Sequence, residues 1–192
     1  MSDLGFYFGI GWQHIISTDA LDHQLFILAL ASVYTFKNIK QVLILVTAFT
    51  IGHSLTLALS VLDVIRFPSN WVEFLIPCTI FITAINNLWR ISKKNGSVNV
   101  NYYLALGFGL IHGMGFANTI RIMLAKDQSI GMGLLGFNLG LEAGQIVVVA
   151  VILTLAMLWV NYLRVTRRDW VFFISASVFA LSVQMALERL PF

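Results

Sequence analysis

The chain has 192 residues, of which 58% are hydrophobic and only 11% are charged. Soluble domains carry about 25% charged residues, so this composition excludes an ordinary soluble protein and indicates one membrane domain over residues 1–192. The 12 basic residues only slightly outnumber the 9 acidic ones. Most of the basic residues lie in short loops, where they act as signals for orientation in the membrane. We therefore expect the lipid bilayer as a partner and no nucleic acid.

Six apolar stretches are each long enough to cross the hydrocarbon core as an α-helix of about 20 residues. They are predicted over residues 9–35, 41–62, 71–90, 102–124, 130–160 and 170–188. The first and the fifth are long enough to tilt or to break. We therefore predict an all-α polytopic membrane bundle of about six transmembrane helices. The first residues lack a basic segment and a small-residue cleavage site, so we expect the first helix to remain in the mature protein.

The loops after the first, third and fifth stretches hold most of the basic residues. Eight lie on this side, namely Lys37, Lys40, Arg90, Lys93, Lys94, Arg164, Arg167 and Arg168. Four lie on the other side, namely Arg66, Arg121, Lys126 and Arg189. The positive-inside rule then predicts cytoplasmic positions for these three loops and extracytoplasmic positions for both termini. We expect a multi-pass protein of the cytoplasmic (inner) membrane.

The first stretch contains the segment H-I-I-S-T-D-A-L-D-H, which runs from His14 to His23. An ionisable side chain at the centre of a membrane helix costs roughly 2.5–3.5 kcal/mol on insertion scales, so such residues indicate a functional site by default. If the segment is helical, Asp19 shares a face with His23 and is also a neighbour of Asp22. All four side chains are candidate ligands or proton carriers, with His14 and Asp19 nearer the outer face. The alternative is a solvated polar patch with one buried Asp–His hydrogen bond.

The second stretch contains His53 within the segment F-T-I-G-H-S-L-T-L. It is the one titratable group between Lys40 and Asp63, and Ser54 beside it is a candidate for orienting the imidazole. We expect His53 to belong to a site. The alternative is a lone histidine that joins two helices by a hydrogen bond and only stabilises packing.

The fourth stretch contains His112 among closely spaced glycines, in the segment G-F-G-L-I-H-G-M-G-F-A. Small residues such as Gly109 and Gly113 let two helix backbones approach closely. Glycines also tolerate a broken helix, which can place carbonyl oxygens near a site. His112 is therefore a candidate ligand, and close packing with an incidental histidine is the alternative.

The fifth stretch contains the segment F-N-L-G-L-E-A-G-Q. The spacing of Asn138, Glu142 and Gln145 places all three on one helix face. Glu142 is a candidate ligand or proton carrier, and the two amides are secondary candidates. The same stretch has a stripe of small residues that we expect to dock on another helix, within the chain or in a homo-oligomer. The stripe consists of Gly136, Gly140 and Gly144.

One residue from each of four stretches is predicted at a similar depth. At a rise of about 1.5 Å per residue, these residues lie roughly 15–21 Å from the ends of their helices, near the bilayer midplane. They are His23, His53, His112 and Glu142. Scattered polar residues would not share a depth. Because imidazole and carboxylate groups are typical ligands of divalent transition metals, the pattern favours a buried metal site.

At these residues the chain resembles the HupE/UreJ family of membrane proteins, which comprises nickel or cobalt permeases and accessory proteins for hydrogenase and urease. The resemblance covers nearly the whole chain and rests on G-W-Q-H-I, D-H-Q-L-F-I-L-A-L, T-A-F-T-I-G-H-S-L-T-L, G-L-I-H-G-M-G-F-A and F-N-L-G-L-E-A-G-Q. It implies that the characteristic polar residues are His14, Asp22, His23, His53, His112 and Glu142. The gap from His14 to Asp22 is longer here than in the His-x5-Asp-His form typical of the family.

Our leading hypothesis is a transporter that passes a divalent transition metal ion through this site. Nickel, cobalt and zinc all suit imidazole ligands, so the residues do not choose among them. The alternative is an intramembrane zinc-dependent hydrolase, with Glu142 or Asp22 as general base and Ser54 as an oriented hydroxyl. A metal sensor or assembly subunit ranks third. The chain has no P-loop pattern, which argues against direct ATP-driven pumping.

Overall fold

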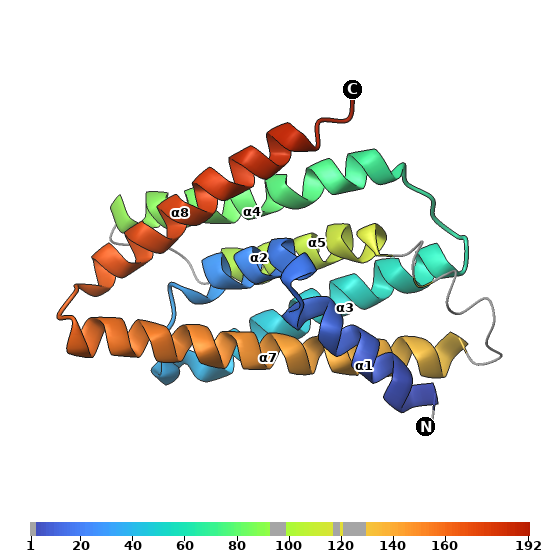
Figure 1. Ribbon diagram of the computed structural model, residues 1–192, viewed down its shortest axis with the longest axis horizontal. Helices are drawn as coiled ribbons and strands as arrows, with labels where there is room; N and C mark the ends of the chain where they lie inside the picture. Colours follow the sequence, from blue (N-terminus) through green and yellow to red (C-terminus); the bar gives the residue numbers. More distant parts are fainter. Residues whose placement is uncertain (1–2, 93–98, 117–119, 121–129) are drawn as a thin grey trace.

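The computed structural model describes residues 3–92, 99–116, 120 and 130–192. Secondary structure in these residues is entirely helical, with seven α-helices and two 3-10 turns (Figure 1). In chain order the elements are α1 (Asp3–Ile16), η1 (Thr18–Ala20), α2 (Leu21–Ala31), η2 (Phe36–Asn38), α3 (Ile39–Val61), α4 (Ser69–Ser92), α5 (Asn99–Gly115), α7 (Ile130–Tyr162) and α8 (Arg167–Glu188). This confirms the all-α class.

Four helical segments of the described chain are long and apolar enough to cross a membrane. They are Phe36–Val61, Ser69–Ile91, Ile130–Tyr162 and Arg167–Glu188. The remaining helices, α1, α2 and α5, fall short of the ~20 residues that one crossing needs, so the count of six crossings stays a prediction. The predicted stretch 102–124 is helical up to Gly115, and most of its remainder lies outside the described residues. The loop residues Lys93, Lys94, Arg121 and Lys126 also lie outside the described residues.

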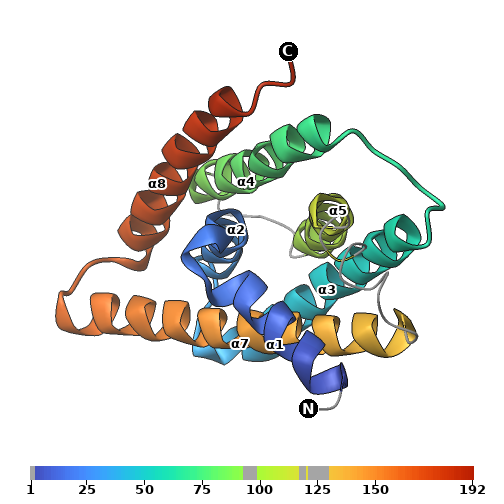
Figure 2. The ribbon, with the colours of Figure 1, turned by 45° about the vertical axis from the view of Figure 1, so that its right-hand side comes forward.

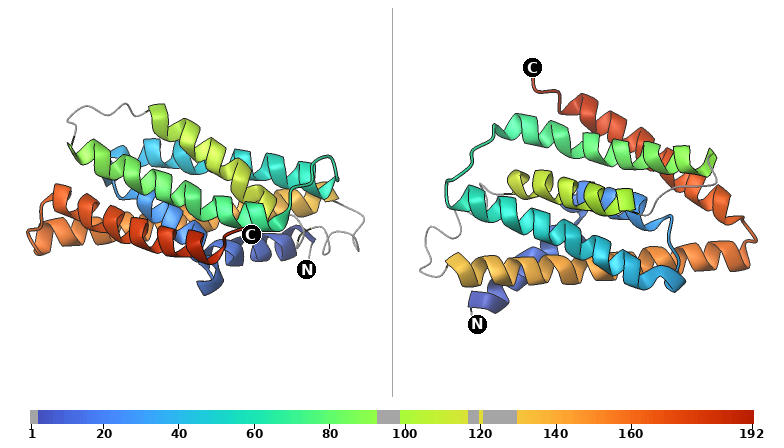
Figure 3. Two further views of the ribbon diagram at one scale, coloured as in Figure 1. Left: turned by 90° about the horizontal axis from the view of Figure 1, so that it is seen from above. Right: turned by 180° about the vertical axis from the view of Figure 1, so that it is seen from behind.

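The bundle is built from three closely packed helix pairs: α3 with α5, α1 with α7, and α4 with α8. Figures 1 and 2 show α2 in the interior, where it contacts α4, α7 and α8. A helix that is apolar on all sides is normally buried, and α2 is buried along most of its length. Figure 3 shows that both termini lie toward the same end of the bundle.

Glycine permits the close crossing of α7 with α1. A Cβ atom added at Gly140 would overlap the carbonyl oxygen of Phe8 and lie 2.9 Å from the backbone nitrogen of Trp12. Gly11 of α1 meets the backbone of Phe137 in the same way, with its added Cβ 2.8 Å from the carbonyl carbon. The predicted docking of the glycine stripe is therefore confirmed, and it occurs within one chain.

The α3–α5 pair is equally tight and brings two histidines close to the contact. An added Cβ at Gly109 would overlap the Phe49 carbonyl oxygen and lie 3.1 Å from the backbone nitrogen of His53. Gly113, which follows His112, faces the same turn of α3, with its added Cβ 3.0 Å from the carbonyl carbon of His53. The glycines around His112 thus place α5 directly against the turn that carries His53.

The first predicted stretch is broken between α1 and α2. Ser17 has an extended backbone, with φ −65° and ψ 157°, and the 3-10 turn η1 follows it. A helix end leaves carbonyl groups without helical donors, and lipid offers no replacement. The side-chain amide of Gln24 lies 3.1 Å from the carbonyl oxygen of Ile15 and 2.9 Å from that of Ser17. Gln24 therefore supplies the hydrogen-bond donor that the carbonyl groups at the end of α1 lack.

The other end of α2 is held in the same manner by distant side chains. The amide of Asn87 donates to the carbonyl oxygen of Ala29 at 2.7 Å. The guanidinium of Arg167 donates to the carbonyl oxygen of Val33 at 2.6 Å. Both ends of this short interior helix are thus tied to the rest of the bundle, which keeps α2 in a defined position.

Candidate metal centre

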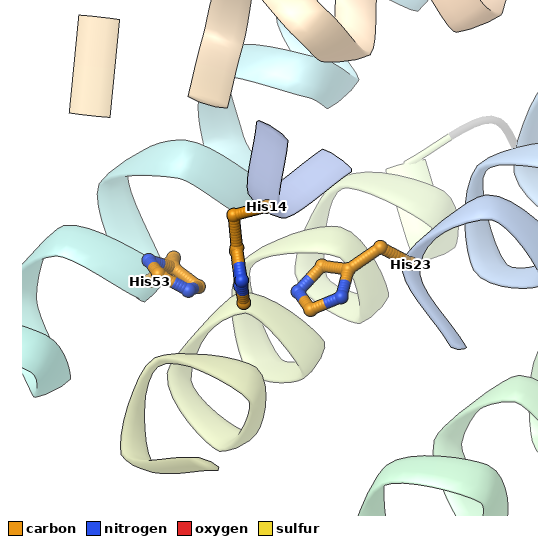
Figure 4. Close-up of side chains that lie close together, drawn as sticks. All are labelled: His14, His23 and His53. Atoms are coloured by element: carbon orange, nitrogen blue, oxygen red, sulfur yellow. The ribbon is translucent and has the colours of Figure 1, made fainter. Parts of the chain in front are cut away.

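Three histidines from three different helices converge in the interior. His14 comes from α1, His23 from α2 and His53 from α3, and Figure 4 shows their rings directed toward a common space. One nitrogen from each ring lies within 4.8 Å of the others. The ring centroids of His14 and His23 are 4.6 Å apart, and that of His53 is 6.0 Å from His14. We call these three residues the histidine cluster.

The break at Ser17 makes this cluster possible. In a continuous helix, residues as far apart as His14 and His23 would be separated by about 13.5 Å along the axis and would point to opposite sides. The extended Ser17 and the turn η1 redirect the chain, so that the two rings meet edge to face at an interplanar angle of 67°. The break thus lies within the segment that separates His14 from His23.

His112 of α5 adjoins the cluster through His23. The two ring centroids are 4.8 Å apart. Nδ1 of His112 lies 2.9 Å from the carbonyl oxygen of Phe108, and because a carbonyl can only accept, Nδ1 carries the proton. The Nε2 atom therefore keeps its lone pair. His112 is outside the group of three residues whose nitrogens lie within 4.8 Å of one another. Its Nε2 atom is a further acceptor beside that group.

The imidazole nitrogens are buried without conventional partners. Nε2 of His14, His23 and His112 and both ring nitrogens of His53 have no hydrogen-bond partner among the residues that the structure describes. His53 is fully buried, with 0% exposure. An unsatisfied buried polar group costs about 1–3 kcal/mol. The cross-helix hydrogen bond expected of a packing histidine is not found for His53 in this part of the chain, so the arrangement fits a cation better than packing.

Aromatic rings enclose the cluster. The Phe116 ring lies 4.0 Å from that of His14 and stacks on Phe137 at 5.4 Å. Phe137 in turn stacks on His53 at 6.0 Å, and Phe49 also stacks on His53 at 6.0 Å. These rings supply no strong ligand atom. They restrict water, and in the resulting low dielectric the interactions of the imidazoles with a charge are strengthened.

A cavity of about 570 Å³ connects this centre with one end of the bundle. We call it the vestibule. Its inner wall includes His14, His23 and His112, while exposed Asp19 and Glu73 lie at its mouth. The sequence interpretation missed Glu73, although its place in the first turns of a predicted span was a signal that could have identified it.

Asp22 lines the vestibule but is already paired. Its carboxylate accepts a hydrogen bond from the guanidinium of Arg189 at 2.7 Å, and the two side chains are 15% and 32% exposed respectively. Asp19 lies in η1, so its predicted helical relation to His23 does not occur. The structure therefore brings three of the predicted histidines together and leaves both aspartates in the approach to them.

Glu142 lies in a separate polar contact between α7 and α3. The hydroxyl of Thr47 donates to its carboxylate at 2.6 Å, and Thr47 is about 9 Å from His53 along α3. Beside this contact, the hydroxyl of Thr50 donates to Gln145 at 3.0 Å. The predicted convergence in depth therefore does not bring Glu142 into the histidine cluster.

The two remaining secondary candidates lie near His53. The side-chain amide of Asn138 donates to the carbonyl oxygen of Leu134 at 2.8 Å, and its own oxygen is buried without a hydrogen-bond partner among the described residues. The hydroxyl of Ser54 donates to the carbonyl oxygen of Thr50 at 2.6 Å. Ser54 and Asn138 thus each donate to a backbone carbonyl of their own helix, and neither forms a hydrogen bond with His53 among the described residues.

The family model for HupE/UreJ proteins matches residues 1–189. The chain belongs to the HupE/UreJ family. The matched region contains every residue of the histidine cluster and the vestibule, so the geometry above is that of a HupE/UreJ protein throughout. No curated protein and no solved structure gave a match. The metal-binding roles of the individual residues stay predictions.

Proposed function

We propose that this HupE/UreJ protein carries a divalent transition metal ion across the membrane through the histidine cluster. The observation that carries the proposal is the convergence of three imidazoles, buried for His23 and His53 and partly buried for His14, whose nitrogens lie within 4.8 Å of one another. Family membership favours nickel or cobalt as the substrate, and imidazole chemistry admits zinc as well. The protein resides, on this proposal, in the cytoplasmic membrane.

The proposed topology has six crossings, with α1 and α2 together forming the first. Four segments have the length and composition of membrane spans, and α5 packs along α3 as the fourth crossing would. Both termini then lie outside, as the distribution of basic residues favours. The vestibule opens near η1 and Arg189, so it faces the extracytoplasmic side and provides the way in.

The spacing of the imidazoles suits transient binding. Nitrogen atoms that share one zinc or similar ion lie about 2.0–2.1 Å from it and therefore about 3–4 Å from one another. The separation within the cluster reaches 4.8 Å, so a shift of about 1 Å would close the rings on an ion. Transport requires binding that is favourable enough to admit the ion and weak enough to release it. We propose that the cluster tightens around its substrate and in this way meets both conditions.

We also propose that Glu142 carries protons in exchange for the metal. Histidine binds metal only in its neutral form, so metal and protons compete for the cluster. Glu142 is hydrogen-bonded to Thr47, apart from the imidazoles, which supports a carboxylate that acts beside the metal path and not as a ligand. Glu142→Gln should then leave metal binding nearly unchanged and abolish proton-driven uptake.

The proposal is tested by uptake of Ni²⁺ or Co²⁺ into proteoliposomes. His23→Ala and His53→Ala should reduce uptake at least tenfold, because each removes one of three ligands. Gly107→Ala is a suitable control, since nothing lies within 4 Å of a Cβ added there. Uptake that survives both histidine substitutions, or purified protein that binds neither metal, would contradict the proposal.

The hydrolase alternative receives no support from the site. Its proposed hydroxyl, on Ser54, donates to a backbone carbonyl, and its proposed bases are engaged elsewhere, Glu142 by Thr47 and Asp22 by Arg189. None of the three reaches the imidazoles in the way that activation of a metal-bound water would require.

A further inference from the structure

The vestibule contains an internal cation. Among the described residues that line it, three carry carboxylates and one carries a permanent positive charge. The acidic residues are Asp19, Asp22 and Glu73, and the basic residue is Arg189. A cavity with this balance attracts cations, and the first cation that it meets belongs to the protein itself.

Arg189 lies in the wall of this cavity and is held in place by two contacts. It follows the last turn of α8, where its backbone N–H donates to the carbonyl oxygen of Met185 at 3.2 Å. Its guanidinium reaches Asp22 at the start of α2, 2.7 Å away. Asp22 directly precedes His23, whose Nε2 is buried without a partner among the described residues. The ion pair therefore lines the same cavity as His14 and His23 of the histidine cluster.

We propose that Arg189 is a tethered competitor that occupies Asp22 until an entering divalent cation displaces it. This inference rests on the proposed function and deepens it, because it assigns a residue that sets the selectivity of the same path. The guanidinium and the entering ion compete for one carboxylate. A divalent ion brings two positive charges to Asp22 in place of the single charge of Arg189, and it also gains the nearby imidazoles as ligands. A monovalent ion gains neither the additional charge nor the imidazoles. Arg189 thus raises the threshold for entrance and excludes Na⁺ and K⁺.

The test measures Ni²⁺ binding to purified full-length protein at low and high salt. Arg189→Gln should bind Ni²⁺ about fivefold more tightly than wild type, the effect expected from losing a partly exposed competing ion pair. Arg189→Lys, which keeps the charge, should stay close to wild type. In an Asp22→Asn background, Arg189→Gln should have no further effect. The difference should shrink as salt screens the charges.

Arg66 provides a matched control. It pairs with Asp63 in an exposed loop, so Arg66→Gln removes the same charge outside the vestibule and should leave Ni²⁺ affinity unchanged. If Arg66→Gln tightens binding as much as Arg189→Gln does, the effect is one of net charge and the proposal is overturned. Unchanged or weaker binding by Arg189→Gln also overturns it, since a residue that merely clamps α8 to α2 behaves in that way.

A second measurement uses wild-type protein and does not depend on the folding of a variant. Phenylglyoxal modifies free guanidinium groups, so Ni²⁺ should increase the modification of Arg189 measured by mass spectrometry. Modification that Ni²⁺ does not change overturns the proposal. Ni²⁺ binding by the His53→Ala variant distinguishes a failure of the competitor role from a failure of the proposed function. If this variant loses Ni²⁺ while Arg189→Gln matches wild type, only the competitor role fails. If no form binds Ni²⁺, the proposed function fails with it.

Discussion

The contact of α3 with α5 at Gly109 offers the sharpest test of how the fold positions the site. The substitution Gly109→Ala adds a methyl group that overlaps the Phe49 carbonyl oxygen and lies 2.9 Å from its carbonyl carbon. Carbon atoms in contact are ordinarily about 3.5–4.0 Å apart. The two helices must therefore separate by about 1 Å, and the displaced turn of α3 is the one that carries His53.

The size of the stability loss is estimated by comparison with Gly107→Ala on the same helix, where an added Cβ meets nothing within 4 Å. Both substitutions gain the same helix propensity, up to about 1 kcal/mol. Their difference therefore isolates overpacking, which typically costs about 1–3 kcal/mol. Gly109→Ala should be less stable than Gly107→Ala by that amount. Because the displaced turn carries His53 away from the other two imidazoles, Gly109→Ala should also bind Ni²⁺ about tenfold more weakly.

The assay is reversible unfolding in detergent micelles, combined with Ni²⁺ titration of the folded protein. Gly107→Ala should match or exceed the wild type in stability and bind Ni²⁺ with wild-type affinity. Equal stability and equal affinity for the two variants would refute the close α3–α5 contact and the dependence of His53 on it.

Three further predictions concern the break, the chemistry of the ligands and the polar contact of α3 with α7. Gln24→Leu should lower the unfolding free energy by about 1 kcal/mol in the same unfolding assay, because partly buried carbonyls lose their donor. It should also weaken Ni²⁺ binding, because His14 and His23 no longer meet. Ni²⁺ affinity measured by titration should be lower at about pH 5 than at about pH 7.5, because a protonated imidazole has no lone pair; affinity that rises with acidity would contradict imidazole ligation. Thr50→Val should reduce thermal stability, because the buried oxygen of Gln145 loses its donor, and a melting temperature equal to that of wild type would count against this contact.

The helices themselves were predictable from the sequence because lipid leaves a spanning segment almost no other way to satisfy its backbone. The apolar stretch 41–62 became α3 (Ile39–Val61), and 170–188 became α8 (Arg167–Glu188). The glycine spacing on α7 correctly indicated a close helix contact. Family membership was also recognisable, since the motifs around the histidines are local in sequence.

The break between α1 and α2 was not predictable from local sequence. Ser, Thr, Asp and Ala are all compatible with a helix, and the break depends on the amide of Gln24, which reaches back to carbonyl groups of α1. The length of the first stretch allowed for a break, but its position was not indicated, and in a continuous helix His14 and His23 would point to opposite sides.

The rise per residue gives an expected depth for each side chain, but it does not give the direction in which the side chain points. Glu142 illustrates this limit, because its contact with Thr47 depends on how α7 crosses α3. The pair of Asp22 with Arg189 joins opposite ends of the chain, and no local pattern signals such a contact.

X-ray absorption spectroscopy of the purified protein loaded with one equivalent of Ni²⁺ tests the central claim most directly. Our account predicts a first shell that contains at least three imidazole nitrogens, and a loss of one of them in His14→Ala, His23→Ala or His53→Ala. A shell of oxygen atoms alone, or a spectrum that none of these substitutions changes, would contradict the claim that the histidine cluster binds the metal.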